Sequence, residues 1–133
     1  MLKMAPELQL LGLAVIIGVV QLMWAAAAAQ AQRGDLKWNM GPRDEPMPIH
    51  GVAARLDRAF RNFMETFPLL AAAVLAAYLA GKLGTLTLWG AGLYVGARAL
   101  YAPLYASGVS VIRSLVWGVS LVGVLMVAAA IFL

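Results

Sequence analysis

The sequence contains no cysteine and a single histidine, His50. The absence of cysteine excludes disulfide bonds, thiolate metal sites and a cysteine nucleophile. One histidine cannot form a multi-histidine centre within one chain, so we expect no metal site. Charged side chains are also scarce, at 12% of 133 residues, whereas 63% of the residues are hydrophobic. A soluble domain of this length cannot bury so much apolar surface, so the composition predicts an integral membrane protein.

The few charges that are present carry a basic excess, with a formal net charge of +4 and a sequence pI of about 9.9. In a soluble protein this balance would indicate nucleic-acid binding. Here the basic residues gather in one loop and at the ends of apolar runs. That distribution is typical of membrane topology and contact with anionic headgroups, so we expect a lipid bilayer and no nucleic acid as partner.

Four apolar runs lie at about 8–31, 59–80, 83–102 and 109–133. Each run, as an α-helix, is long enough to cross a hydrocarbon core of about 30 Å. The runs are too long for barrel strands, and helices satisfy their own backbone groups in lipid. The first run could be a cleaved signal peptide, but it is long for that role, so we interpret it as a membrane span.

The connections between the runs are short, except for the first. Short joints at 81–84 and 103–108 favour antiparallel neighbours. The connection at 32–54 is rich in glycine, proline and charge, which predicts a surface loop without a long helix. The predicted fold is an all-α integral membrane protein, an antiparallel four-helix transmembrane bundle in a single domain (1–133). Its helices are expected at about 8–31, 55–80, 83–103 and 108–133.

The distribution of basic residues predicts how the bundle is oriented. Four of them lie in or beside the first loop: Arg33, Lys37, Arg43 and Arg55. Elsewhere, Lys82 lies in the joint at 81–84 and Lys3 near the N-terminus. Positive charge marks the cytoplasmic side, so we expect the first loop in the cytoplasm and both termini outside.

Polar residues of three predicted helices fall at this cytoplasmic end. The second helix brings Arg58, Arg61, Asn62 and Glu65 within an arc of about 100°. The third helix carries a stripe of Tyr94, Arg98, Tyr101 and Tyr105, and the fourth begins with Ser110, Arg113, Ser114 and Trp117. The pattern predicts a polar pocket that is rich in positive charge and opens toward the cytoplasmic interface.

Some of these side chains also have structural interpretations. Arginines near helix ends can extend to lipid headgroups, which would account for Arg55 and Arg58. Arg61 lies four residues from both Asp57 and Glu65, so Glu65 could neutralise it or contact a ligand. Arg98 and Arg113 lie within or near apolar runs, where charges usually face a bundle interior or a site. Several arginines with one carboxylate suit a small polyanion that also carries an amine.

Two sequence patterns resemble one protein family. Residues 58–68 read R-x-x-R-N-x-x-E-T-x-P, and residues 97–117 read ARALYAPLYASGVSVIRSLVW. Both are similar to the MAPEG family, membrane-associated proteins in eicosanoid and glutathione metabolism, and especially to its small bacterial members. The resemblance covers essentially the whole chain. It implies a homotrimer in a bacterial inner membrane, with glutathione as co-substrate between adjacent subunits.

The resemblance also implies roles for particular residues. It assigns Arg113 to stabilising the glutathione thiolate, and so to catalysis. It assigns the following residues to glutathione binding: Arg58, Arg61, Asn62, Glu65, Arg98, Tyr101, Tyr105 and Ser114. A guanidinium close to a thiol favours the thiolate, which is the reactive nucleophile. We hypothesise that this thiolate attacks a lipophilic electrophile, as in a glutathione transferase or peroxidase.

Two other functions are compatible with a small helical membrane protein. A non-catalytic membrane scaffold or assembly subunit with the same fold would bind no glutathione, and this alternative stays open. A small multidrug transporter also has four short helices, but such a carrier needs an isolated carboxylate in its first helix. Here no acidic residue follows Glu7 in that helix, so the transporter is disfavoured.

Overall fold

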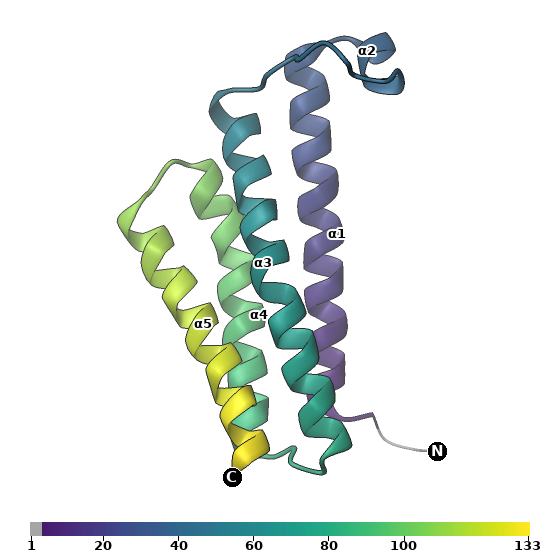
Figure 1. The fold of residues 1–133 in the computed structure, drawn as a ribbon. Helices are drawn as coiled ribbons and strands as arrows, with labels where there is room; N and C mark the ends of the chain where they lie inside the picture. Colours follow the sequence, from purple (N-terminus) through teal and green to yellow (C-terminus); the bar gives the residue numbers. More distant parts are fainter. Residues whose placement is uncertain (1–3) are drawn as a thin grey trace.

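The computed structural model describes residues 4–133, and this part of the chain consists of helices and their connections (Figure 1). The helices are α1 (Pro6–Arg33), α2 (Leu36–Met40), α3 (Gly51–Leu79), α4 (Thr85–Ala106) and α5 (Val111–Phe132). The four long helices form an antiparallel bundle, and α2 is a single short turn beside it. The predicted all-α, antiparallel four-helix architecture is confirmed.

The two ends of the bundle differ in what connects the helices. One end, called here the loop end, holds the connection between α1 and α3 and the turn between α4 and α5 (Figure 1). The opposite end holds the start of α1, the α3–α4 turn and the C-terminus. Lys3, which contributed to the predicted orientation, lies outside the described residues.

The first connection is shorter and more ordered than the sequence suggested. It contains α2, which begins where the Asp35 carboxylate accepts a hydrogen bond from the Trp38 backbone N–H at 3.0 Å. Helix α3 begins at Gly51, before the predicted start at 55. The apolar run marks the segment that lipid accepts, whereas a helix can extend into water once the last proline of the loop, Pro48, is passed.

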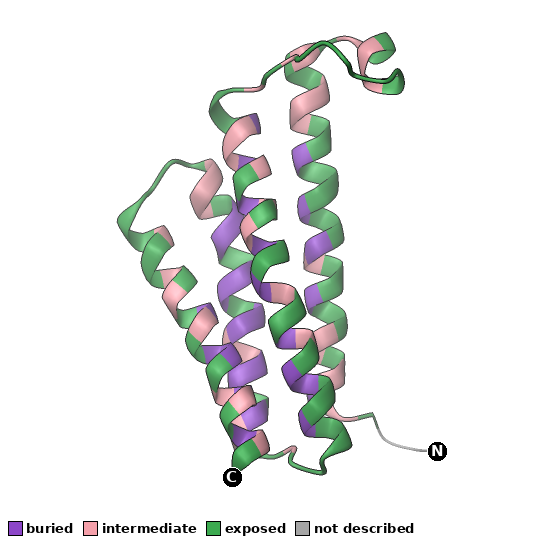
Figure 2. Ribbon diagram, in the orientation of Figure 1, coloured by how far each residue is buried: buried purple, intermediate pink, exposed green. Residues whose placement is uncertain are grey.

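Helix α4 occupies the centre of the bundle and contacts α1, α3 and α5. Its buried surface is correspondingly extensive (Figure 2). Within residues 4–133, α1, α3 and α5 are long and apolar enough to cross a membrane, but α4 does not reach that apolarity. Because three helices surround α4, it can carry tyrosines, glycines and Arg98 that a lipid-facing helix would expose.

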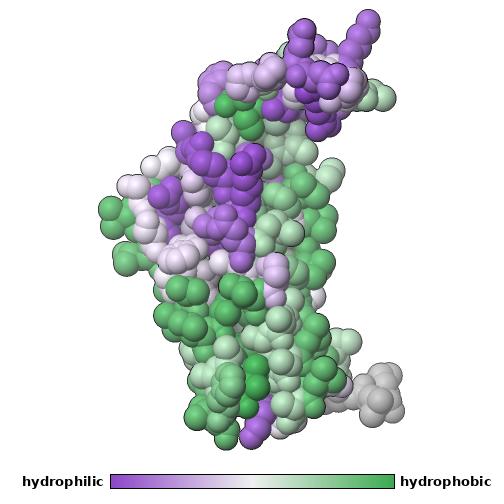
Figure 3. Space-filling model, viewed as in Figure 1, coloured by the Kyte–Doolittle hydropathy of each residue, from purple (hydrophilic) through white to green (hydrophobic). Residues whose placement is uncertain are grey.

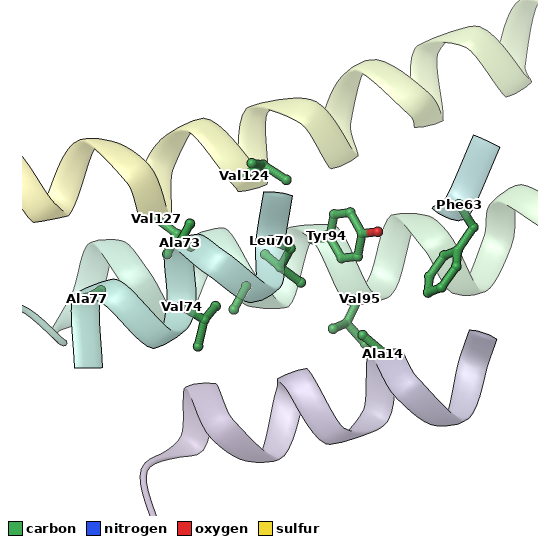
Figure 4. Close-up of a cluster of buried hydrophobic side chains, with 11 residues drawn as sticks. Ala14, Phe63, Leu70, Ala73, Val74, Ala77, Tyr94, Val95, Val124 and Val127 are labelled. Atoms are coloured by element: carbon green, nitrogen blue, oxygen red, sulfur yellow. The ribbon is translucent and has the colours of Figure 1, made fainter. Parts of the chain in front are cut away.

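The core joins all four long helices (Figure 4). Leu70 and Val74 of α3 pack with Tyr94 of α4 and Val127 of α5, and all four side chains are fully buried. Helices α4 and α5 approach closely, because a Cβ atom added to Gly123 would lie 2.5 Å from the Gly90 carbonyl oxygen. Large apolar side chains cover the outward faces of the helices, as expected where lipid is the solvent.

Candidate functional site

A cavity of about 370 Å³ lies among α3, α4 and α5 in the half of the bundle nearest the loop end. Figure 3 shows a hydrophilic patch over this half, whereas the opposite half is largely hydrophobic. We call this cavity among α3, α4 and α5 the arginine cavity. It is lined by Arg58, Arg61, Asn62, Glu65, Tyr101, Tyr105 and Arg113. The structure therefore brings seven of the nine predicted site residues together around one space.

Two guanidinium groups lie close to the Tyr105 ring. The Cζ atom of Arg113 lies 4.4 Å from the ring centroid, and that of Arg58 lies 5.8 Å from it. Arg58 Nε also donates a hydrogen bond to the Tyr105 hydroxyl oxygen at 3.2 Å. The edge of the neighbouring Tyr101 ring meets Tyr105 at a centroid distance of 5.7 Å. Two cations thus lie against one aromatic side chain at the edge of the cavity, and their combined charge favours an anion in the cavity.

Of the two acidic side chains near the cavity, Asp57 forms an ion pair and Glu65 does not. Arg61 Nε lies 3.0 Å from Asp57 Oδ2, so the ion pair forms with Asp57 and not with Glu65. It is the one ion pair recorded within residues 4–133, and Glu65 takes no part in it. The Glu65 carboxylate remains available for a cation, while Arg58 and Arg113 face the same cavity without a carboxylate partner among the described residues.

Two buried groups near the cavity have no hydrogen-bond partner within the described chain. The first is Asn62 Oδ1, an acceptor on a residue that lines the cavity. The second is the Arg98 guanidinium, whose three nitrogens are all unpaired although the side chain is only 1% exposed. Buried polar groups normally have partners, so Asn62 Oδ1 indicates a polar ligand or solvent in the cavity that donates to it. The Arg98 guanidinium lies against aromatic rings instead.

Arg98 does not line the arginine cavity, although it was predicted to contact the ligand. Its Cζ atom lies 4.3 Å from the Tyr101 ring centroid, 5.6 Å from that of Phe63 and 6.0 Å from that of Tyr94. Phe63 lies at one end of the core cluster (Figure 4), and its ring centroid is 6.4 Å from that of Tyr94. Aromatic faces stabilise a cation that has little access to water. Arg98 instead lines a separate hollow between α1 and α4, and its link to the arginine cavity is its contact with the Tyr101 ring.

Ser114 also lies outside the arginine cavity. Its hydroxyl donates a hydrogen bond to the Ser110 backbone oxygen at 3.0 Å, and it lines a separate surface depression together with Val111 and Leu115. An isolated chain thus gives Ser114 no contact with a ligand in the arginine cavity.

The structure adds three residues that support this region. Arg55 Nε donates to the Ala106 carbonyl oxygen at 3.1 Å and so ties the start of α3 to the end of α4. Asp57 orients Arg61, and Phe63 borders Arg98. The spacing of four between Asp57 and Arg61 was visible in the sequence. The Phe63–Arg98 contact joins distant segments, and no sequence pattern indicated it.

These observations define a helical membrane bundle with a cationic cavity near one end. The family model of the MAPEG family matches residues 10–133, which is nearly the whole chain. The chain belongs to the MAPEG family, membrane-associated proteins in eicosanoid and glutathione metabolism, and it is an integral membrane protein. No curated protein and no solved structure matches it.

Proposed function

We propose that the chain binds glutathione in the arginine cavity and activates its thiol for attack on a lipophilic electrophile from the bilayer. The observation that carries this proposal is the convergence of three arginines and one free carboxylate, Glu65, around a single cavity. Family membership supports a relation to glutathione in general.

The donor set fits the charged groups of this tripeptide. Glutathione has two carboxylates and one ammonium group. Arg58 and Arg61 can bind the carboxylates, and the Glu65 carboxylate can accept from the ammonium group. The buried Asn62 Oδ1 atom lacks a donor, and a peptide N–H would supply one. Each charged group of the ligand thus has a partner of opposite charge.

Arg113 has the catalytic role in this proposal. It approaches the cavity from α5, and the Tyr105 ring fixes its guanidinium. A fixed positive charge beside the thiol stabilises the thiolate relative to the protonated form. The thiol proton would pass to water, the thiolate sulfur would form a bond to the electrophilic atom, and the electron pair of the bond that breaks would leave with the leaving group.

The proposal also includes a homotrimer in a bacterial inner membrane, with the loop end in the cytoplasm. The Arg61 side chain is 74% exposed in the single chain, which supports closure of the arginine cavity by an adjacent copy. Ser114 would then face glutathione that is bound by a neighbouring chain. Arg98 would act through Tyr101 by adding positive potential behind the cavity wall.

Calorimetric titration of glutathione into the purified, detergent-solubilised protein tests the proposal. We expect saturable binding that weakens by about tenfold or more in Arg61→Ala, since a charge-assisted hydrogen bond contributes about 1.5–3 kcal/mol. Lys37→Ala removes an exposed positive charge elsewhere on the loop end and should bind like the wild type. A well-folded oligomer that binds no glutathione would refute the proposal and favour a non-catalytic scaffold.

A further inference from the structure

A second hollow lies between α1 and α3 and has two parts that meet at Leu22 and Phe60. The part nearer the loop has a volume of about 350 Å³ and includes polar residues of α1, α2 and the first loop. The other part has a volume of about 250 Å³ and lies deeper along the two helices. We call the two parts together the α1–α3 crevice. None of the residues that line the arginine cavity lines it.

The first loop holds two arginines over the polar part of the crevice. Arg33 Nε donates to the Met47 carbonyl oxygen, and its Cζ atom lies 4.4 Å from the Trp38 ring centroid. Arg43 donates through Nε and Nη2 to the backbone and side-chain oxygens of Asn39, both at 2.9 Å. Arg43 also has a φ of 59°, a conformation that is costly for a residue with a side chain. These bonds fix both guanidinium groups at the mouth of the crevice.

The polar part has an excess of positive charge. Its acidic residue, Asp57, already pairs with Arg61 on the side of the arginine cavity. Neither Arg33 nor Arg43 has a carboxylate within ion-pair distance among residues 4–133. The Gln30 Oε1 atom also lines this part, is buried and has no hydrogen-bond donor. The two arginines favour an anion, and Gln30 Oε1 favours a ligand that also has a hydroxyl group to donate.

The deeper part is apolar throughout. It is lined by Val15, Gly18, Val19, Leu22 and, from α3, by Phe60, Phe63, Met64 and Phe67. Gly18 gives the floor its depth, because a Cβ atom there would lie 2.8 Å from Phe63 Cε1. From Gln30 to Gly18 the helix rises by about 18 Å, close to the thickness of roughly 20 Å of one leaflet with its headgroups. The crevice thus has a charged end and an apolar end at the spacing of a lipid molecule.

We propose that the α1–α3 crevice binds an anionic phospholipid with a hydroxylated headgroup. Its phosphate is bound by Arg33 and Arg43, a headgroup hydroxyl donates to Gln30 Oε1, and one acyl chain lies against Gly18 and Phe63. Asp57 lines the crevice and its partner Arg61 lines the arginine cavity, so this ion pair lies between the lipid and the arginine cavity. The bound lipid would therefore stabilise the start of α3 on the side of the helix that faces α1.

The test measures lipid retention by the full chain in detergent, using native mass spectrometry. The probes are phosphatidylglycerol and phosphatidylcholine with identical acyl chains. Arg43→Gln removes one headgroup contact, and Lys37→Gln is its matched control on the same loop. Leu22→Trp fills the neck between the two parts, and Leu13→Trp places the same side chain on an exposed position of α1 outside the crevice. Helicity and oligomer mass are measured for every variant.

We expect the wild type to retain phosphatidylglycerol in preference to phosphatidylcholine. Arg43→Gln should weaken this retention by about tenfold, Lys37→Gln by less than twofold, and Leu22→Trp but not Leu13→Trp should abolish it. Equal retention of the two lipids, or equal effects of the two loop variants, would overturn the proposal. Competition by glycerol phosphate, which lacks acyl chains, would also overturn the proposal. A change of oligomer mass in Leu22→Trp alone would overturn it too, because it would show that a second copy of the chain occupies the crevice. If Leu22→Trp fails to fold, the comparison of Arg43→Gln with Lys37→Gln decides the matter.

Discussion

Replacing Gly123 by alanine should separate α5 from α4 and weaken glutathione binding at a distance. An alanine Cβ at this position would lie 2.5 Å from the Gly90 carbonyl oxygen and 2.9 Å from the Tyr94 backbone nitrogen. Both neighbours are backbone atoms, so neither can turn away as a flexible side chain would. Overpacking of this kind costs about 1–3 kcal/mol. Because Arg113 lies on the same helix about 15 Å away, a shift of α5 also displaces the proposed catalytic guanidinium.

Gly92→Ala provides the matched control, since a Cβ atom on Gly92 would meet nothing within 4 Å. Each substitution gains about 1 kcal/mol of helix propensity, so the difference between the two variants isolates the steric cost. We expect Gly123→Ala to be less stable than Gly92→Ala by about 1–3 kcal/mol in reversible unfolding in mixed micelles. Glutathione affinity should fall in Gly123→Ala alone. Equal stability of the two variants would refute the close packing of α4 on α5.

Two further substitutions test the arginine cavity and its wall. Glu65→Gln should weaken glutathione binding by about tenfold in calorimetric titration, and this loss should disappear with an analogue that lacks the ammonium group; an unchanged affinity would contradict the assigned role of Glu65. Arg98→Met should change the stability by no more than about 2 kcal/mol, because the loss of the aromatic contacts of the guanidinium is offset by removal of a buried cation without an acidic partner among the described residues. Much stronger destabilisation in thermal unfolding would show that Arg98 has an anionic partner.

The sequence predicted the helical bundle because its main signal, apolar runs long enough to cross lipid, is local. The grouping of the arginine cavity was predictable for a similar reason. The spacing of Arg58, Arg61 and Glu65 fixes one helix face, and short connections bring the ends of α4 and α5 to the same end of the bundle. The charge pattern and the helical periodicity were therefore sufficient to predict that these residues lie around one space.

Contacts that depend on the rotation of one helix against another were not predictable. The GxxxG spacing of Gly92 and Gly96 in the sequence is a weak signal of helix packing, and the close approach lies elsewhere, at Gly90 and Gly123. Neither Gly92 nor Gly96 has a neighbour within 4 Å of an added Cβ. Arg98 shares a stripe with Tyr101 and Tyr105 by spacing alone. Its guanidinium nevertheless lies against the rings of Tyr101, Phe63 and Tyr94 and does not line the arginine cavity.

The helix pattern also left the partner of Arg61 open, since Asp57 and Glu65 are equally distant along the chain. In the structure Arg61 pairs with Asp57, which lies one turn before Arg61 in α3 and is partly exposed. An exposed pair of this kind contributes at most about 1 kcal/mol, which is too little for helix spacing alone to determine the partner. The consequence is functional, because Glu65 is left free in the cavity.

The most direct test of the proposed chemistry is the ultraviolet absorbance of the glutathione thiolate during titration at neutral pH. The wild type should produce a thiolate signal that saturates with binding. Arg113→Ala should still bind glutathione within about tenfold of the wild-type affinity, as expected on loss of one charged contact, but should produce no thiolate signal. Equal thiolate signals from the two proteins would contradict the assignment of Arg113, and a wild type that binds glutathione only as the protonated thiol would contradict thiol activation by this cavity.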